Sequence, residues 1–312
     1  MASPRLHPEL VAFWGDMTRW PSFATMRDER AFWQAWCIER ALPRPPGMVV
    51  RDATIAGAGG AIPIRVYRPA GVARAGAPCL VYCQGGGFVS GTLDSADNLV
   101  WHMAEQAAIV VVSVQYRLAP EHRFPAAFDD AYAAVAAVAA DAAGFGVDPA
   151  HLAVGGDSAG ANLSAAVCLA ARDRRGPAIA GQLLVYGAFG HDEPTESRRK
   201  NTTDPTLSEE SMAAYRRAYF GPAMTTDSPY GAPIKASSHA GLPPAFVVAA
   251  ECDPLRDSSE IYAEKLRATG VETELWVAPA MGHSFLRAWG HGPAIDAVCA
   301  RVAAFARRAC RA

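Results

Sequence analysis

Short apolar runs alternate with longer amphipathic or alanine-rich segments from residue 48 to the last residues of the chain. Apolar runs of about four to eight residues bounded by glycine or proline are typical of strands, and continuous runs favour strands covered on both faces. Strands are expected at residues 49–55, 62–67, 79–83, 107–114, 151–154, 181–186, 245–250 and 272–277. Helices are expected at residues 125–143, 161–171, around 208–220, 258–269 and 294–309.

This alternation predicts an α/β protein with a mostly parallel eight-stranded sheet and helices on both faces. A glycine-rich turn at residues 57–60 predicts an antiparallel opening hairpin. The sheet core is expected to comprise residues 46–187 and 241–312. Residues 188–240 break the rhythm with glycine, proline, aspartate and threonine, so we expect an insertion over the carboxyl ends of the strands, where ligands bind in such sheets.

Residues 1–45 are helical in pattern and unusually aromatic. Their large rings are Trp14, Trp20, Phe23, Phe32, Trp33 and Trp36. One interpretation is an amphipathic segment that packs on the main body. The other is that some rings line an apolar pocket, because a segment before the first strand can fold back over the ligand-binding edge of the sheet. The two interpretations are compatible.

Composition narrows the class of protein without deciding its chemistry. The chain has 312 residues, 51% hydrophobic and 19% charged, which suits one large α/β domain. A net charge of −2 gives no reason to expect nucleic acid or an anionic membrane as partner. The apolar run at residues 107–114 is far shorter than the ~20 residues of a membrane span. Because the N-terminal residues lack the pattern of a signal peptide, a cytoplasmic location is expected.

The seven cysteines are scattered without a C-x-x-C pair. An odd number without pairing is typical of reduced, mostly buried thiols in a cytosolic protein. No zinc or redox site is indicated, and no cofactor or metal is expected.

The segment from Val154 to Gly160 carries the first chemical signal. Gly156-x-Ser158-x-Gly160 lies between a predicted strand and a predicted helix, and it fits the nucleophile elbow, in which a strained turn exposes a serine hydroxyl above the sheet. A Cβ at either glycine would crowd the turn, and the helix N-terminus offers N–H groups to a developing oxyanion. An ordinary glycine-rich turn would match the same short pattern, so the remaining chain has to decide.

A serine nucleophile needs a base and an orienting acid, which in this fold follow it in the order acid, then histidine. Carboxylates follow the strand at residues 245–250, and a histidine, His283, follows the next strand. Of the carboxylates Glu251, Asp253 and Asp257, the last begins a helix and suits a cap, so Asp253 is preferred. His283 is preferred over three other histidines near these segments, which are His191, His239 and His291.

Acyl transfer also needs N–H donors directed at the oxyanion. The glycines at residues 85–87 directly follow the strand at residues 79–83, and residues without Cβ let the backbone approach a substrate closely. An ordinary glycine turn is the alternative. The position of these glycines one strand ahead of the elbow favours the oxyanion role.

Taken together, these motifs resemble those of the bacterial hormone-sensitive lipase-like esterases, within the α/β-hydrolase fold. The likeness covers about residues 48–310. It rests on residues 156–160 (Gly-Asp-Ser-Ala-Gly), 116–122 (Tyr-Arg-Leu-Ala-Pro-Glu-His), 124–126 (Phe-Pro-Ala), 129–130 (Asp-Asp) and 253–257 (Asp-Pro-Leu-Arg-Asp). The resemblance implies that Asp253 is the triad acid and that Gly86, Gly87 and Ala159 supply the oxyanion N–H groups. It also implies a helical cap formed by the N-terminal segment and the insertion.

Three positions depart from the family pattern. Gln84 stands where the family usually has a histidine, Gln115 where it has an aspartate, and Ala161 where it has a glycine. Gln115 and Ala161 are interpreted as structural changes. Gln84 adjoins Gly85 in the oxyanion loop, and we expect its amide to hold that loop by hydrogen bonds in place of an imidazole.

The sequence thus predicts a serine hydrolase that cleaves small carboxylic esters, with short acyl chains favoured, through Ser158, His283 and Asp253. An amide deacetylase or acyltransferase of secondary metabolism would use the same three residues. A non-catalytic ligand receptor is less favoured, because such receptors lack a triad residue and all three are present here. The sequence leaves the choice between a monomer and a homodimer open.

Overall fold

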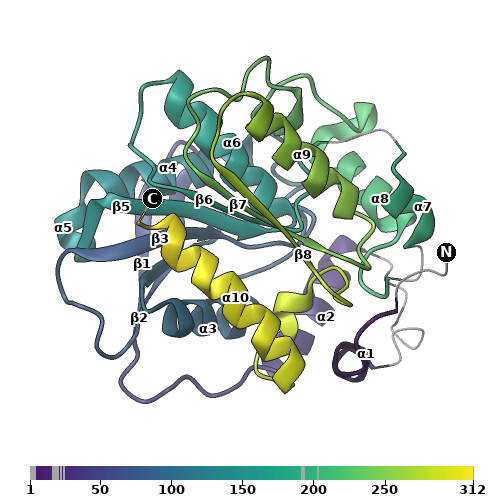
Figure 1. The fold of residues 1–312 in the computed structure, drawn as a ribbon, viewed down its shortest axis with the longest axis horizontal. Coiled ribbons are helices and arrows are strands. Elements are labelled where there is room, and N and C mark those ends of the chain that lie inside the picture. Colours follow the sequence, from purple (N-terminus) through teal and green to yellow (C-terminus); the bar gives the residue numbers. More distant parts are fainter. Residues whose placement is uncertain are drawn as a thin grey trace.

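The computed structural model describes residues 5–15, 21, 23, 25–190, 194–201 and 204–311. Within them, eight strands form one sheet in the order β1-β2-β4-β3-β5-β6-β7-β8 (Figure 1). The strands are β1 (Val49–Gly57), β2 (Gly60–Arg68), β3 (Ala77–Cys83), β4 (Val110–Val114), β5 (Val147–Asp157), β6 (Gln182–Val185), β7 (Ala245–Ala250) and β8 (Thr273–Ala278). The helices are α1 (Pro8–Trp14), α2 (Met26–Glu39), α3 (Asp97–Ala107), α4 (Ala126–Ala140), α5 (Ala142–Phe145), α6 (Ala159–Asp173), α7 (Glu196–Lys200), α8 (Glu209–Phe220), α9 (Arg256–Ala268) and α10 (Pro293–Ala309).

The pairing of the strands confirms the predicted mostly parallel sheet. β1 and β2 form the expected antiparallel hairpin, and β2 pairs antiparallel with β4. The other neighbours, from β4 through to β8, pair in parallel. The carboxyl ends of β3, β5, β7 and β8 therefore meet at one edge of the sheet, which is the edge where ligands bind in such folds.

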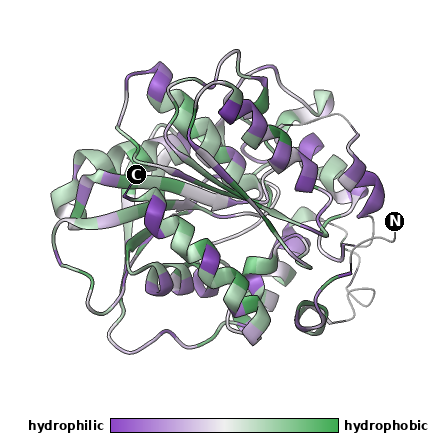
Figure 2. Ribbon diagram, in the orientation of Figure 1, coloured by the Kyte–Doolittle hydropathy of each residue, from purple (hydrophilic) through white to green (hydrophobic). Residues whose placement is uncertain are grey.

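Both faces of the sheet are covered by helices, as predicted. One apolar cluster joins Val81 and Val154 of the central strands to α4, α6 and α9. A second cluster joins the alternate residues Leu80 and Ala153 to α3 and α10 on the opposite face (Figure 1). Successive strand residues point to opposite faces, so a strand covered on both sides is apolar throughout. Figure 2 shows hydrophilic residues gathered on outer helices such as α9.

Two predicted elements are each divided in the structure. The apolar run at residues 107–114 is not one strand, because Ala107 ends the unpredicted helix α3 and β4 begins at Val110. Ala108 makes the turn between them in a left-handed conformation, with φ 52°. The helix predicted at residues 125–143 is divided at Asp141, whose side chain caps the short helix α5 by accepting from Gly144 N–H.

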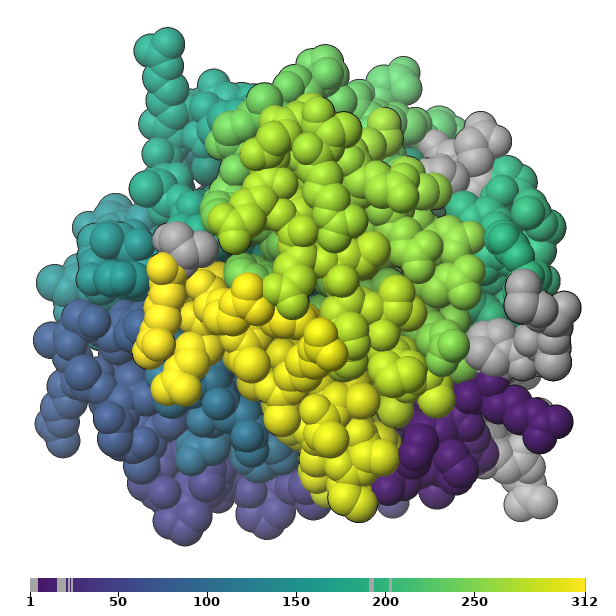
Figure 3. Space-filling view, in the orientation of Figure 1, coloured from purple at the N-terminus to yellow at the C-terminus, as the bar shows by residue number. Residues whose placement is uncertain are grey.

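The N-terminal helices pack beside α10 on the same side of the molecule as α3. Trp14 and Trp36 are buried and stack on each other with 5.0 Å between ring centroids. Glu9 of α1 accepts hydrogen bonds from the first N–H groups of α10, at Ala294 (2.9 Å) and Ile295 (3.2 Å). Figure 3 shows α10 crossing the visible face with the N-terminal segment against one end of it. Trp20 lies outside the described residues.

Candidate functional site

Ser158 lies in a strained turn between β5 and α6, with φ 54° and ψ −118°. A Cβ on Gly156 would lie 2.3 Å from the Cys83 carbonyl oxygen, and one on Gly160 would lie 1.8 Å from it. Both distances are far below van der Waals contact. The crowding predicted from the sequence is therefore present, and the two glycines let the turn pack directly on the end of β3. Strained backbone of this kind persists only where the surrounding structure enforces it.

The structure brings Ser158 together with the predicted base and acid. His283 Nε2 lies 2.9 Å from Ser158 Oγ, and His283 Nδ1 lies 2.7 Å from Asp253 Oδ2. Asp253 is fully buried, and its other carboxylate oxygen accepts the Leu255 N–H at 2.7 Å. Each side chain follows a different strand, β5, β7 or β8, so the sheet edge sets the spacing between them.

The charges around His283 favour its protonated form. Burial opposes a charge on the imidazole, but the adjacent Asp253, together with Asp204 and Asp157, outweighs that effect and raises the pKa of His283. A histidine in this setting can accept a proton from a neighbouring hydroxyl and hold it beside a carboxylate.

The loop at residues 85–87 is held beside Ser158 by Asp157, the residue before the serine. Asp157 Oδ1 accepts the Gly85 N–H at 2.8 Å and the Tyr82 hydroxyl at 2.8 Å. Gly86 (φ 137°) and Gly87 (φ 60°) adopt conformations that favour glycine. Within the described part of the chain, the N–H groups of Gly86, Gly87 and Ala159 donate no hydrogen bond to a protein acceptor.

The expectation that Gln84 holds this loop through its amide is wrong. The Gln84 side chain is fully buried, and neither its Oε1 nor its Nε2 has a hydrogen-bond partner among the described residues. Only the Gln84 main chain takes part, since its carbonyl oxygen accepts the Tyr116 hydroxyl at 2.7 Å. Asp157 and Tyr116 therefore brace the loop. Their signal was present in the sequence, because both lie inside the motifs quoted above.

Asp204 is a site residue that the sequence did not reveal. It lies between α7 and α8 in the insertion, and its Oδ2 accepts the main-chain N–H of His283 at 2.6 Å. Burial, together with the like charge of Asp253, raises the pKa of Asp204 to about 6. Asp204 and His283 are far apart in sequence, and a lone aspartate in an irregular segment carries no local signal of their contact.

The competing candidates have structural partners elsewhere. Glu251 accepts the Ala280 N–H at 2.7 Å, and Asp257 accepts the Ser197 N–H at 2.7 Å. The His239 and His291 rings bond to main-chain carbonyl oxygens, of Pro233 and Arg40 respectively, both at 2.9 Å. His191 lies outside the described residues.

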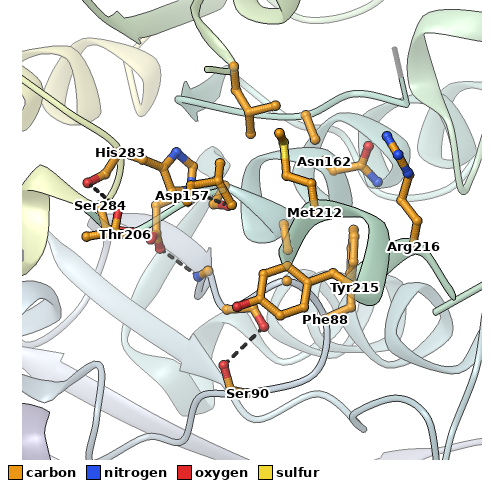
Figure 4. Close-up of a pocket in the computed structure, with 18 of the residues that line it drawn as sticks. Phe88, Ser90, Asp157, Asn162, Thr206, Met212, Tyr215, Arg216, His283 and Ser284 are labelled. Atoms are coloured by element: carbon orange, nitrogen blue, oxygen red, sulfur yellow. Dashed lines mark hydrogen bonds between the residues drawn. The ribbon is translucent and has the colours of Figure 1, made fainter. Parts of the chain in front are cut away.

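A pocket of about 200 Å³ opens above Ser158 and His283. Its aromatic lining comes from the N-terminal segment, the loop after β3 and the insertion, and consists of Phe23, Phe32, Trp33, Phe88, Tyr215 and Phe220. Figure 4 shows His283 and Thr206 at one end of the pocket and Asn162 and Arg216 at the other, with Met212 and Tyr215 of α8 between them. The N-terminal rings therefore divide their roles, since Trp14 and Trp36 pack inside while Phe23, Phe32 and Trp33 line the pocket.

A metal site, a reactive thiol and a membrane span each place requirements on the described residues. There, no group of histidine, cysteine, aspartate or glutamate side chains could hold a metal ion. All seven cysteines are free and buried, and burial raises the pKa of Cys37 to about 11 and that of Cys83 to about 12. None of the described helices has the length and apolar character to cross a membrane.

Known proteins resemble this chain in sequence and in structure. The family described as having the alpha/beta hydrolase fold matches residues 80–287. Esterase LipI of Mycobacterium tuberculosis is 41% identical over 260 residues, covering 82% of this chain and 81% of that protein. Carboxylesterase NlhH of the same species is 42% identical over 234 residues, covering 72% and 71%. The chain belongs to the hormone-sensitive lipase-like esterases of the α/β-hydrolase family.

Solved structures agree with this membership. An esterase from Pyrobaculum calidifontis superposes with a TM-score of 0.88 at 36% identity, covering 97% of this chain and 98% of the other.

The departures of the present chain from the family pattern at Gln115 and Ala161 are accommodated structurally. Gln115 bonds to the segment after the loop at residues 85–87, through Leu93 N–H (2.8 Å) and the Gly91 carbonyl (3.2 Å), and Ala161 is fully buried in α6.

Proposed function

We propose that this α/β-hydrolase cleaves carboxylic esters with Ser158 as nucleophile, His283 as general base and Asp253 as the acid that orients the imidazole. The observation that carries the proposal is the unbroken chain of hydrogen bonds from Asp253 through His283 to Ser158 Oγ at the base of an apolar pocket. The relatives that are named esterases support ester cleavage as the reaction.

The reaction follows from the positions of these groups. His283 takes the Ser158 hydroxyl proton as Oγ attacks the ester carbonyl, and Asp253 stabilises the imidazolium that forms. The N–H groups of Gly86, Gly87 and Ala159 bind the oxyanion of the tetrahedral intermediate. His283 then protonates the leaving alcohol. The acyl group remains on Ser158 until a water molecule, activated by the same histidine, releases the acid.

The size of the pocket supports small substrates. Its volume of about 200 Å³ is below the range of about 300 to 1,000 Å³ typical of sites for drug-sized ligands. We therefore assign short acyl chains, and either aliphatic or aromatic alcohols, to this site. The N-terminal segment and residues 188–240 form a cap in this proposal, because side chains from both line the pocket above the sheet edge.

Replacing Ser158 tests the mechanism. Ser158→Ala should lower kcat/KM for p-nitrophenyl acetate by at least about 10⁴-fold without unfolding the protein, because only the nucleophile is lost. Ser164→Ala is the matched control: Ser164 is buried in α6, the helix that follows Ser158, and its hydroxyl bonds to the Gly160 carbonyl at 2.8 Å, away from the pocket. Substantial turnover in the first variant would refute Ser158 as nucleophile.

A substrate series tests the bond and the acyl length. p-Nitrophenyl esters of rising acyl chain length should show the highest kcat/KM at about two to four carbons, which is roughly the length that the pocket admits. Amide analogues, and alcohol or amine acceptors added beside the esters, separate a hydrolase from a deacetylase or acyltransferase. Faster cleavage of the amides would reassign the reaction while keeping the three residues.

A further inference from the structure

The insertion at residues 188–240 forms hydrogen bonds to the main chain of His283, the proposed catalytic base. Asp204 Oδ2 accepts the His283 N–H at 2.6 Å, while the Thr206 hydroxyl lies 3.1 Å from the His283 carbonyl oxygen. Asp204 Oδ1 in turn accepts the Thr206 N–H at 2.8 Å and lies 2.8 Å from its hydroxyl. Two residues of the insertion, Asp204 and Thr206, therefore contact both main-chain polar groups of His283.

The approach of Asp204 depends on a residue without a side chain. A Cβ on Gly282 would lie 2.7 Å from Asp204 Oδ2, closer than Cβ contacts normally come. Asn201, earlier in the insertion, donates its side-chain amide to the carbonyl oxygens of Asp253 (3.0 Å) and Glu251 (3.2 Å). The insertion thus binds the loops that carry both the acid and the base.

We propose that Asp204 is a positioning residue, which orients the His283 imidazole toward Ser158 and supplies a second negative charge near it. The role rests on the function proposed above. Asp253 bonds to the ring of His283, and Asp204 bonds to its main chain from the opposite segment. Catalysis is sensitive to the position of the base, because a displacement of about 1 Å can lower the rate by about 10²-fold.

The charged groups around Asp204 make its role measurable through the pKa of His283 and the pH dependence of kcat/KM. Asp253 and Cys252 face it from the loop after β7, and His283 faces it from the loop after β8. The Asp204 charge is one of the interactions that raise the pKa of His283. Removing this charge should therefore lower the pKa of His283 and move the acid limb of kcat/KM to lower pH.

Asp204→Asn is the decisive variant. An amide has one acceptor oxygen, so it cannot keep both the His283 and the Thr206 contacts. We expect kcat for a short p-nitrophenyl ester to fall about tenfold with KM within about twofold. The His283 ring, followed by NMR in the resting enzyme and assigned by the signal lost in His283→Gln, should titrate at lower pH than in the wild type.

Glu251→Gln is the matched control, because it weakens a similar bond from a carboxylate to the same loop, at Ala280, without touching His283. It should leave the His283 titration in place. An unchanged titration in Asp204→Asn, or equal losses of kcat in both variants without a shift, would overturn the positioning role. The NMR titration needs no substrate, so it still decides the role of Asp204 if the wild type hydrolyses no ester and the proposed function fails.

Discussion

Gln84 combines complete burial with an amide that bonds to nothing in the described structure. An unsatisfied buried polar group typically costs about 1 to 3 kcal/mol. The residue is therefore a local source of instability directly before the loop of Gly85, Gly86 and Gly87. The loop itself is held by Asp157 and Tyr116, so the Gln84 side chain can change without releasing it.

Gln84→Met should raise the free energy of unfolding by about 1 kcal/mol, since methionine has a similar length and no unsatisfied group. Ester kcat/KM should stay within about tenfold, because the proposed oxyanion donors are main-chain groups. Urea denaturation and p-nitrophenyl ester kinetics measure the two effects. In Gln182→Met, the control, the gain should be smaller or absent, because Gln182 Nε2 donates to the Pro243 carbonyl at 3.0 Å and only its Oε1 lacks a partner among the described residues.

At the scale of elements, one helix, α2, both bonds to loops of the sheet core and supplies side chains that line the pocket. Arg30 bonds to the carbonyl oxygens of Val89 and Ala119 and pairs with Glu121 at 2.7 Å, which ties the helix to loops of the sheet core. Two and three residues after Arg30, Phe32 and Trp33 line the pocket. The helix therefore positions these rings relative to Ser158.

Phe32→Ala should raise KM for aryl or branched esters by about tenfold while changing kcat for an acetyl ester by less than about twofold, because the ring contacts substrate and not the reacting atoms. Steady-state kinetics on the two classes of ester give the comparison. Ile38→Ala serves as control, since Ile38 lies on the same helix and is 48% exposed. Equal effects of both substitutions would mean that α2 acts only through stability.

The elements that the sequence predicted well are those with a clear local signal. β7 was predicted with its bounds unchanged, since its six apolar residues are bounded by proline and by charged residues. α3 was missed because it ends at Ala107 within an apolar run and because Ala108, not glycine, takes the left-handed position after it. Ser158, Asp253 and His283 were predicted together because each lies at or shortly after the carboxyl end of a strand. Asp204 was not predicted, since its hydrogen bond to the His283 N–H forms only when the insertion folds back over the sheet edge.

At the scale of the whole molecule, Asp204 links activity to stability. Its pKa of about 6 in the folded protein lies above the ordinary 3.8, so the folded state binds the proton more tightly than the unfolded chain. The stability from this group is therefore present below about pH 4 and is lost as the pH rises through 6. At neutral pH the ionised carboxylate costs roughly 2 to 3 kcal/mol.

At about pH 7.5, the free energy of unfolding of Asp204→Asn, measured by urea denaturation, should therefore exceed that of the wild type by roughly 1 to 3 kcal/mol, because the amide carries no charge to bury. The difference should shrink or reverse at about pH 4, where the wild-type carboxyl is protonated and the variant still lacks one of the contacts to His283 and Thr206. Equal differences at the two pH values would show that ionisation of Asp204 is not the cause. A variant that is more stable and less active is the pattern expected where a site carries strain.

The buried thiols have one more consequence. An alkylating reagent attacks the thiolate, and burial raises the pKa values of Cys37 and Cys83 as well as closing access to them. Each cysteine of the folded chain therefore reacts only when its own surroundings open. Brief labelling followed by peptide mass spectrometry would time these openings separately: Cys37 reports α2 leaving the core, Cys252 reports the loop of Asp253, and Cys83 reports loss of the central sheet.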